Sequence, residues 1–179
     1  LYTHYAADPD GTAAAADALR PILATQAAGA PVMVLRDYHA ENILDLPDRA
    51  GPAAAGLLDF QDALAGHPAY DLASLIRDAR RDLHPGTAEA CIARYCAATG
   101  TAEAPFRAAL AALAVQRNLR ILGVFARLAT DHGKPGYLPL LPRVWAHLHT
   151  DLRHPALAPA RAALAALPDP AAVRARVAA

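Results

Sequence analysis

Apolar positions near the start of the chain repeat at the spacing of one helix face. Within residues 13–28, Leu19, Ile22 and Leu23 fall on a common side when the segment is wound at about 3.6 residues per turn. Pro21 lies inside this segment, where its ring and its missing N–H disfavour a regular helix. The pattern therefore predicts a helix that is kinked, or restarted, at Pro21.

Short apolar runs replace the helical pattern further along. The runs 31–35, 43–46 and 55–60 are rich in aliphatic side chains and have the length of strands. A polar stretch, 36–42, separates the first two, and the cluster 47–52 contains the proline and glycine of a turn. We expect three short strands, the first of them buried.

After Pro68 the chain is helical in pattern almost to its end. Helices are expected over 71–81, 87–98, 104–130 and 137–150, with one or two short ones up to Val177. The sequence therefore predicts an α+β fold, mainly α, in which a few short strands carrying acidic loops are wrapped by a helical bundle.

Composition narrows the class of protein. The 179 residues are 55% hydrophobic, which allows a sizeable core and excludes an intrinsically disordered chain. The net charge is zero, so nothing favours nucleic acid or an anionic membrane as a partner. No uninterrupted apolar stretch of about 18 residues and no signal-peptide layout is present, so we expect no membrane span. Cys91 and Cys96 are expected to be reduced thiols in a cytoplasmic protein.

The densest group of polar side chains lies between the first two predicted strands. Asp37 and Asn42 are five positions apart there, and Asp59 follows near the end of the third predicted strand. This spacing is that of the catalytic loop in protein-kinase-like phosphotransferases. In such a site one carboxylate accepts or orients the proton of the acceptor hydroxyl, and a neutral carboxamide with a second carboxylate can bind magnesium.

Three segments together resemble the aminoglycoside phosphotransferase/choline kinase family of small-molecule kinases: LRDYHAEN at 35–42, LLDFQDA at 57–63 and GHPAYDL at 66–72. The first two are most similar to bacterial sugar kinases that act on the anomeric hydroxyl of N-acetylmuramate and N-acetylglucosamine in cell-wall recycling. The resemblance covers 32–81 and, more loosely, 116–147. It implies the C-terminal lobe of a protein-kinase-like fold that uses ATP and Mg²⁺.

The resemblance also implies roles for individual residues. Asp37 would be the catalytic base or hydroxyl-orienting group, and Asn42 and Asp59 would bind the magnesium that accompanies the ATP phosphates. Asp71 would be structural, its carboxylate accepting hydrogen bonds that brace the catalytic loop. The family often has a histidine two residues before the catalytic aspartate, where this sequence has Leu35. Because that histidine serves the geometry of the loop more than the chemistry, its absence does not imply inactivity.

Four more side chains are candidates for contact with the substrate: Arg36, Asp62, Arg117 and Asn118. Arg36 could equally form a structural salt bridge, and Asp62 could belong to a surface turn. Arg117 and Asn118 belong to a polar patch in an apolar helix, which could line a substrate site, brace the interior or face solvent. The balanced charge, with Arg36, Arg117 and Arg120 near the expected site, favours a neutral or carboxylate-bearing sugar or amino sugar over a polycationic aminoglycoside.

The segment before the catalytic loop lacks the residues with which a kinase N-terminal lobe clamps a nucleotide. It holds Gly11 and Gly29 but no glycine-rich loop and no lysine. The single lysine of the chain, Lys134, follows much later. We therefore expect 1–179 to be a kinase-like C-terminal lobe without its N-terminal lobe. Its parts would be a catalytic core, 1–83, and a helical subdomain, 84–179.

Two classes of function remain. The first is an ATP-dependent kinase of a small-molecule hydroxyl, whose isolated lobe is expected to be inactive, with an aminoglycoside kinase as the alternative within this class. The second is a non-catalytic, kinase-like fragment that binds a ligand. The joint presence of Asp37, Asn42 and Asp59 favours the first, because a relic has no physical reason to keep all three.

Overall fold

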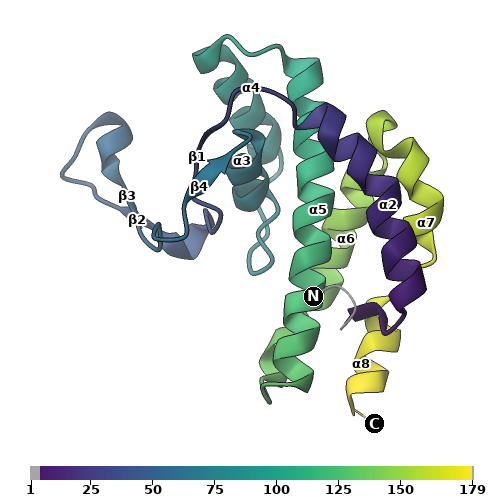
Figure 1. Ribbon diagram of the computed structural model, residues 1–179. Coiled ribbons are helices and arrows are strands. Elements are labelled where there is room, and N and C mark those ends of the chain that lie inside the picture. Colours follow the sequence, from purple (N-terminus) through teal and green to yellow (C-terminus); the bar gives the residue numbers. More distant parts are fainter. Residues whose placement is uncertain (1–4, 179) are drawn as a thin grey trace.

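The computed structural model describes residues 5–178 and shows a long central helix with shorter helices around it and two small sheets to one side (Figure 1). Helix α2 (Pro9–Gln26) begins where the Asp8 side chain accepts a hydrogen bond from the backbone N–H of Gly11, at 3.0 Å. The helix thus begins at Pro9, four residues before the apolar run at 13–28. The helix continues past Pro21 as one element, so the predicted restart does not occur.

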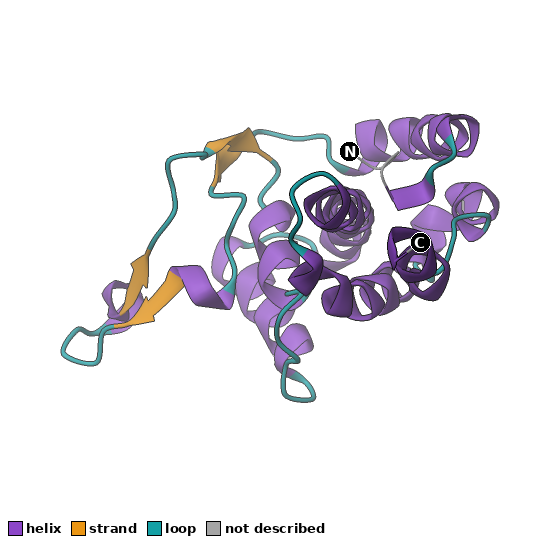
Figure 2. Cartoon of the chain, turned by 90° about the horizontal axis from the view of Figure 1, so that it is seen from below, coloured by secondary structure: helices purple, strands orange, loops and turns teal. Residues whose placement is uncertain are grey.

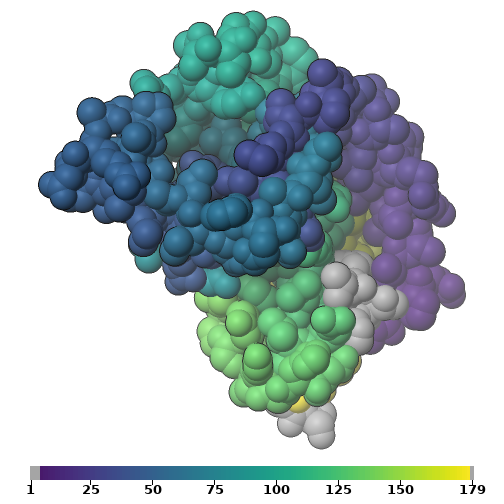
Figure 3. All heavy atoms as spheres, turned by 60° about the vertical axis from the view of Figure 1, so that its left-hand side comes forward, coloured from purple at the N-terminus to yellow at the C-terminus, as the bar shows by residue number. Residues whose placement is uncertain are grey.

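Between residues 5 and 178, four short strands form two separate antiparallel pairs. β1 (Val32–Val34) pairs with β4 (Leu64–Gly66), and β2 (Ile43–Asp45) pairs with β3 (Ala55–Leu57). The β2–β3 hairpin projects from the helical body (Figures 1 and 3). All three predicted strands are present but shorter than predicted. β4 was missed because its three residues include no β-branched or aromatic side chain, which the strand pattern requires.

The prediction that the first strand is buried is wrong for two of its three residues. Val34 is 2% exposed, whereas Val32 and Met33 are 45% and 75% exposed. Met33 lies on the side opposite Val34 because side chains alternate along a strand, whereas Val32 shares the side of Val34 and is exposed at the beginning of the strand. The third strand stops at Leu57 because Asp59 has a φ of 56°, which an extended strand cannot accommodate.

Helices make up most of the rest of the chain. They are α3 (Ala69–Ile76), α4 (Thr87–Thr99), α5 (Glu103–Thr130), α6 (Leu141–Leu152), α7 (Arg161–Ala165) and α8 (Pro170–Ala178). The predicted helix 71–81 ends early, at Ile76. The predicted helix 137–150 begins at Leu141 because the two prolines of the preceding segment, Pro135–Leu140, confine it to a 3-10 turn.

Helix α5 contributes to both hydrophobic clusters of the described chain. Its second half packs with α2, α6 and the C-terminal helices through residues such as Leu122 and Leu148. Its first half packs with α3 and α4 through Phe106 and Ile92. Viewed along its axis, the helix lies inside the ring of the others (Figure 2). By length and composition α5 could cross a membrane, but 78% of its most apolar window is buried within the fold, as in a core helix.

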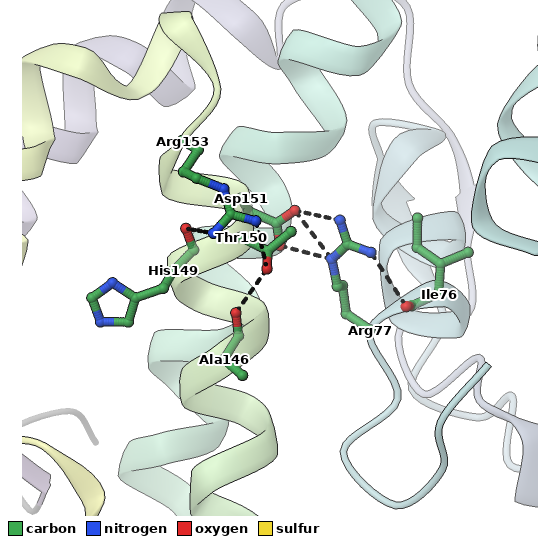
Figure 4. A network of polar contacts seen from close by, with 7 residues as sticks. All are labelled: Ile76, Arg77, Ala146, His149, Thr150, Asp151 and Arg153. Atoms are coloured by element: carbon green, nitrogen blue, oxygen red, sulfur yellow. Dashed lines mark hydrogen bonds and ion pairs between the residues drawn. The ribbon is translucent and has the colours of Figure 1, made fainter. Parts of the chain in front are cut away.

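A buried ion pair joins the end of α3 to α6 (Figure 4). The Arg77 guanidinium donates to both carboxylate oxygens of Asp151, with Nη2 at 2.6 Å from Oδ1 and Nε at 3.0 Å from Oδ2. The Asp151 side chain is only 2% exposed, so the charge of this carboxylate is compensated by Arg77 and not by water. The pair therefore fixes the segment that carries α3 against the helical bundle.

Candidate active site

The start of the catalytic loop is held by α3. Asp71, in the first turn of that helix, accepts hydrogen bonds from the backbone N–H groups of Leu35 (2.7 Å) and Arg36 (2.9 Å). The Ser74 hydroxyl donates to the carbonyl oxygen of Arg36 at 3.3 Å. Arg36 adopts a φ of 71°, which is unfavourable for a non-glycine residue and is held here by these contacts. Asp37 is the next residue, so its backbone is positioned by β1 on one side and by the contacts of α3 on the other.

The Asn42 side chain connects the segments that carry the sequence motif. Its Nδ2 donates to the backbone carbonyl of Asp37 at 2.9 Å and lies 3.5 Å from Oδ2 of Asp59. The backbone N–H of Leu58 donates to the carbonyl oxygen of Asn42 at 2.9 Å, which ties the two segments together. The structure thus brings Asp37, Asn42 and Asp59 into one connected group. The φ of 56° at Asp59 is a second strained backbone position beside the loop.

The donor set suits a magnesium ion that arrives with a nucleotide. Asn42 and Asp59 offer carboxamide and carboxylate oxygens, the hard ligands that Mg²⁺ prefers, and Asp59 is exposed. Oδ1 of Asp59 accepts a hydrogen bond from the Gln61 side chain. Within residues 5–178, no group of three or more His, Cys, Asp or Glu side chains could hold a metal ion by itself. Mg²⁺ commonly takes one or two protein ligands together with phosphate oxygens and water, so these residues fit that mode.

Arg36 and Asp62 contact each other beside the catalytic loop. Nη1 of Arg36 lies 3.8 Å from Oδ2 of Asp62 and donates to its backbone carbonyl at 3.4 Å. Arg36 also lines a cavity of about 590 Å³ beside the loop, so it both forms an ion pair and faces the open space. The Asp62 side chain is 62% exposed, and the pair is therefore a weak one.

Arg117 and Asn118 are buried in α5, at 7% and 0% exposure, so the solvated-face interpretation is wrong for both. Nη1 of Arg117 and both amide atoms of Asn118 have no hydrogen-bond partner among the described residues. Burial lowers the pKa of Arg117, and the charges of Tyr70 and Asp37 oppose that change. Neither residue lines the 590 Å³ cavity; their neighbours Gln116 and Arg120 do. The polar patch at 116–120 is the sequence feature that identified Arg117 and Asn118 as candidates.

Comparison with known proteins agrees with this geometry. The phosphotransferase enzyme family (APH) matches residues 3–111, more than half of the chain. An N-acetylmuramate/N-acetylglucosamine kinase of Caulobacter vibrioides is 48% identical over 79% of this chain and 39% of its own length. Proteins described in the same way from Pseudomonas aeruginosa and Neisseria meningitidis serogroup B are 36% and 35% identical, over 77% and 84% of this chain.

The chain spans less than half the length of each of these relatives, 39% to 45%. The matched region includes the loop of Asp37 and Asn42, the strand end at Asp59 and the helix that carries Asp71. A mainly helical fold with two small sheets agrees with the C-terminal lobe of a kinase. The chain belongs to the phosphotransferase enzyme family.

Proposed function

We propose that this chain is the catalytic lobe of an ATP-dependent kinase that phosphorylates a hydroxyl of an amino sugar, the anomeric hydroxyl of N-acetylmuramate or N-acetylglucosamine. The observation that carries the proposal is the connected group of Asp37, Asn42 and Asp59, in which Asn42 contacts both of the other residues. The similarity to kinases described for these two sugars supports the choice of acceptor.

The chemistry assigned to the site follows from the side chains. The Asp37 carboxylate accepts the proton of the acceptor hydroxyl, or orients that hydroxyl toward the phosphoryl group. Asn42 and Asp59 would hold Mg²⁺, which neutralises charge on the nucleotide phosphates when it is bound. Asp71 positions the loop through the backbone of Leu35 and Arg36, so that Asp37 stays directed at the acceptor.

The charge of the cavity beside the loop distinguishes a sugar from an aminoglycoside as acceptor. Its charged lining residues are Arg36 and Arg120, and among the residues that the structure describes no Asp or Glu side chain belongs to the lining. A polycationic aminoglycoside would meet like charge there, whereas a neutral or acidic sugar would not. The non-catalytic alternative is disfavoured because the Asp37, Asn42 and Asp59 group, with its two strained backbone positions, is kept intact.

This chain spans less than half the length of its relatives. We assign the binding of the nucleotide between two lobes to a part of the protein outside these 179 residues. We therefore expect this lobe alone to be inactive and the protein expressed at full length from its gene to be active in the cytoplasm, where ATP is available.

The test is a turnover assay with the full-length protein, ATP and Mg²⁺ on N-acetylmuramate, N-acetylglucosamine and an aminoglycoside. The expected product is the sugar 1-phosphate, identified by mass spectrometry and by its lability to mild acid. Turnover restricted to the aminoglycoside would replace the proposed acceptor. Nucleotide binding without turnover on any acceptor would support the non-catalytic alternative.

A further inference from the structure

A cavity of about 590 Å³ lies beside the start of the catalytic loop, between α2, the β1–β4 pair and α5. Apolar side chains from all three elements form part of its wall: Leu23, Val34, Leu64 and Leu113. Five polar side chains also line the cavity: Arg36, His67, Tyr70, Gln116 and Arg120. Arg36 lines this cavity and directly precedes Asp37 in the chain, so the catalytic loop contributes to the wall of the cavity.

The charge of this cavity is positive and only partly compensated. Arg36 is engaged by Asp62, through a 3.8 Å ion pair and a 3.4 Å hydrogen bond to its carbonyl oxygen. Arg120 has no hydrogen bond or ion pair within the described part of the chain. The ring of His67 accepts a hydrogen bond from the Ala69 N–H at 3.2 Å, and burial lowers its pKa, so this ring is neutral at pH 7.

A second cation lies behind Arg120. Arg117, one helical turn earlier on α5, is 7% exposed, and its Nη1 has no hydrogen-bond partner among residues 5–178. Its interaction with Arg120 is repulsive, and the negative charges near it, on Asp37 and Asp78, do not line the cavity. An anion bound at Arg120 would relieve this repulsion, and a guanidinium binds a carboxylate through two parallel hydrogen bonds.

We propose that Arg120, assisted by Gln116 and Arg36, binds a carboxylate carried by the acceptor sugar. The inference rests on the function proposed above and adds a specificity residue to it. N-acetylmuramate differs from N-acetylglucosamine by a lactyl ether that ends in a carboxylate. The cavity therefore discriminates between the two sugars through this group, while the hydroxyl to be phosphorylated is presented to Asp37.

The experiment compares binding of the two sugars to the full-length protein by isothermal titration calorimetry, for the wild type and for Arg120→Met. Methionine keeps the apolar stem of the half-buried side chain and removes its charge. The preference for N-acetylmuramate, as the ratio of the two dissociation constants, should fall by roughly ten- to a hundredfold, the effect of losing a charge-assisted pair. The methyl ester of N-acetylmuramate should bind the wild type and the variant with equal affinity.

Arg127→Met is the matched control, because Arg127 is also half-buried on α5 but does not line the cavity. It should leave the preference unchanged. An unchanged preference in Arg120→Met, or an equal loss of affinity for both sugars and for the ester, would overturn the subsite. Turnover is measured in parallel: binding that follows Arg120 without phosphorylation of either sugar would contradict the proposed kinase activity and leave the subsite supported.

Discussion

Removal of the Asp71 carboxylate is the sharpest test of how the fold positions the catalytic loop. Asp71→Ala leaves the N–H groups of Leu35 and Arg36 without the acceptor that they reach at 2.7 and 2.9 Å. A hydrogen bond to a charged group contributes about 1.5–3 kcal/mol, so two would contribute at most about 6 kcal/mol. Because Asp71 is half-buried, water can hydrogen-bond to the two N–H groups in its place. We therefore expect the free energy that stabilises the folded loop to fall by about 2–4 kcal/mol.

This loss should be local, because both donors lie in the loop. Amide hydrogen exchange of a peptide covering 32–42, followed by mass spectrometry in the full-length protein, measures it directly. A loss of about 2–4 kcal/mol corresponds to exchange that is faster by roughly thirty- to a thousandfold. Exchange in α6 should be unchanged. Turnover should fall because the loop that carries Asp37 becomes less ordered. As a control, Asp62→Ala removes the exposed ion-pair partner of the Arg36 side chain and leaves both backbone hydrogen bonds to Asp71 in place. Equal exchange in the wild type and Asp71→Ala would refute the brace.

Four more changes have defined outcomes. Asp37→Asn should lower kcat by orders of magnitude without changing the free energy of unfolding, and a near-normal kcat would contradict its role. Asp59→Ala should abolish the Mg²⁺ dependence of nucleotide binding, measured by titration with and without the metal. Arg77→Met leaves the Asp151 carboxylate buried and unpaired, so denaturant unfolding should show a loss of about 3–5 kcal/mol, recovered in part by adding Asp151→Leu. Burial lowers the pKa of His147 from its ordinary value of 6.5, so the unfolded chain takes up a proton at a higher pH than the folded chain does. The free energy of unfolding should therefore decrease as the pH falls below 6.5. This decrease should be smaller in His147→Gln.

The positions of the strands and helices could largely be predicted from the sequence. Helices α4 and α5 begin and end within a residue or two of the predicted ranges, because their apolar spacing and the glycine at 100 are local signals. The chemistry was also accessible, since Asp37, Asn42 and Asp59 occur at a spacing typical of phosphotransferases. The errors were the missed strand β4, the burial of β1, the restart at Pro21 and several element ends, among them the end of the third strand near the strained Asp59.

Only the tertiary structure decided which distant residues share a site. The resemblance implied that Asp71 braces the loop, but its donors, the N–H groups of Leu35 and Arg36 at 36 and 35 positions' distance in sequence, came from the structure. The same holds for the cavity in which Arg36 from the catalytic loop meets Arg120 from α5. The physical reason is that the sequence pattern reports which side of each element is apolar. The partner of each polar side chain depends on how those apolar sides pack together, which becomes defined only when the whole chain is folded.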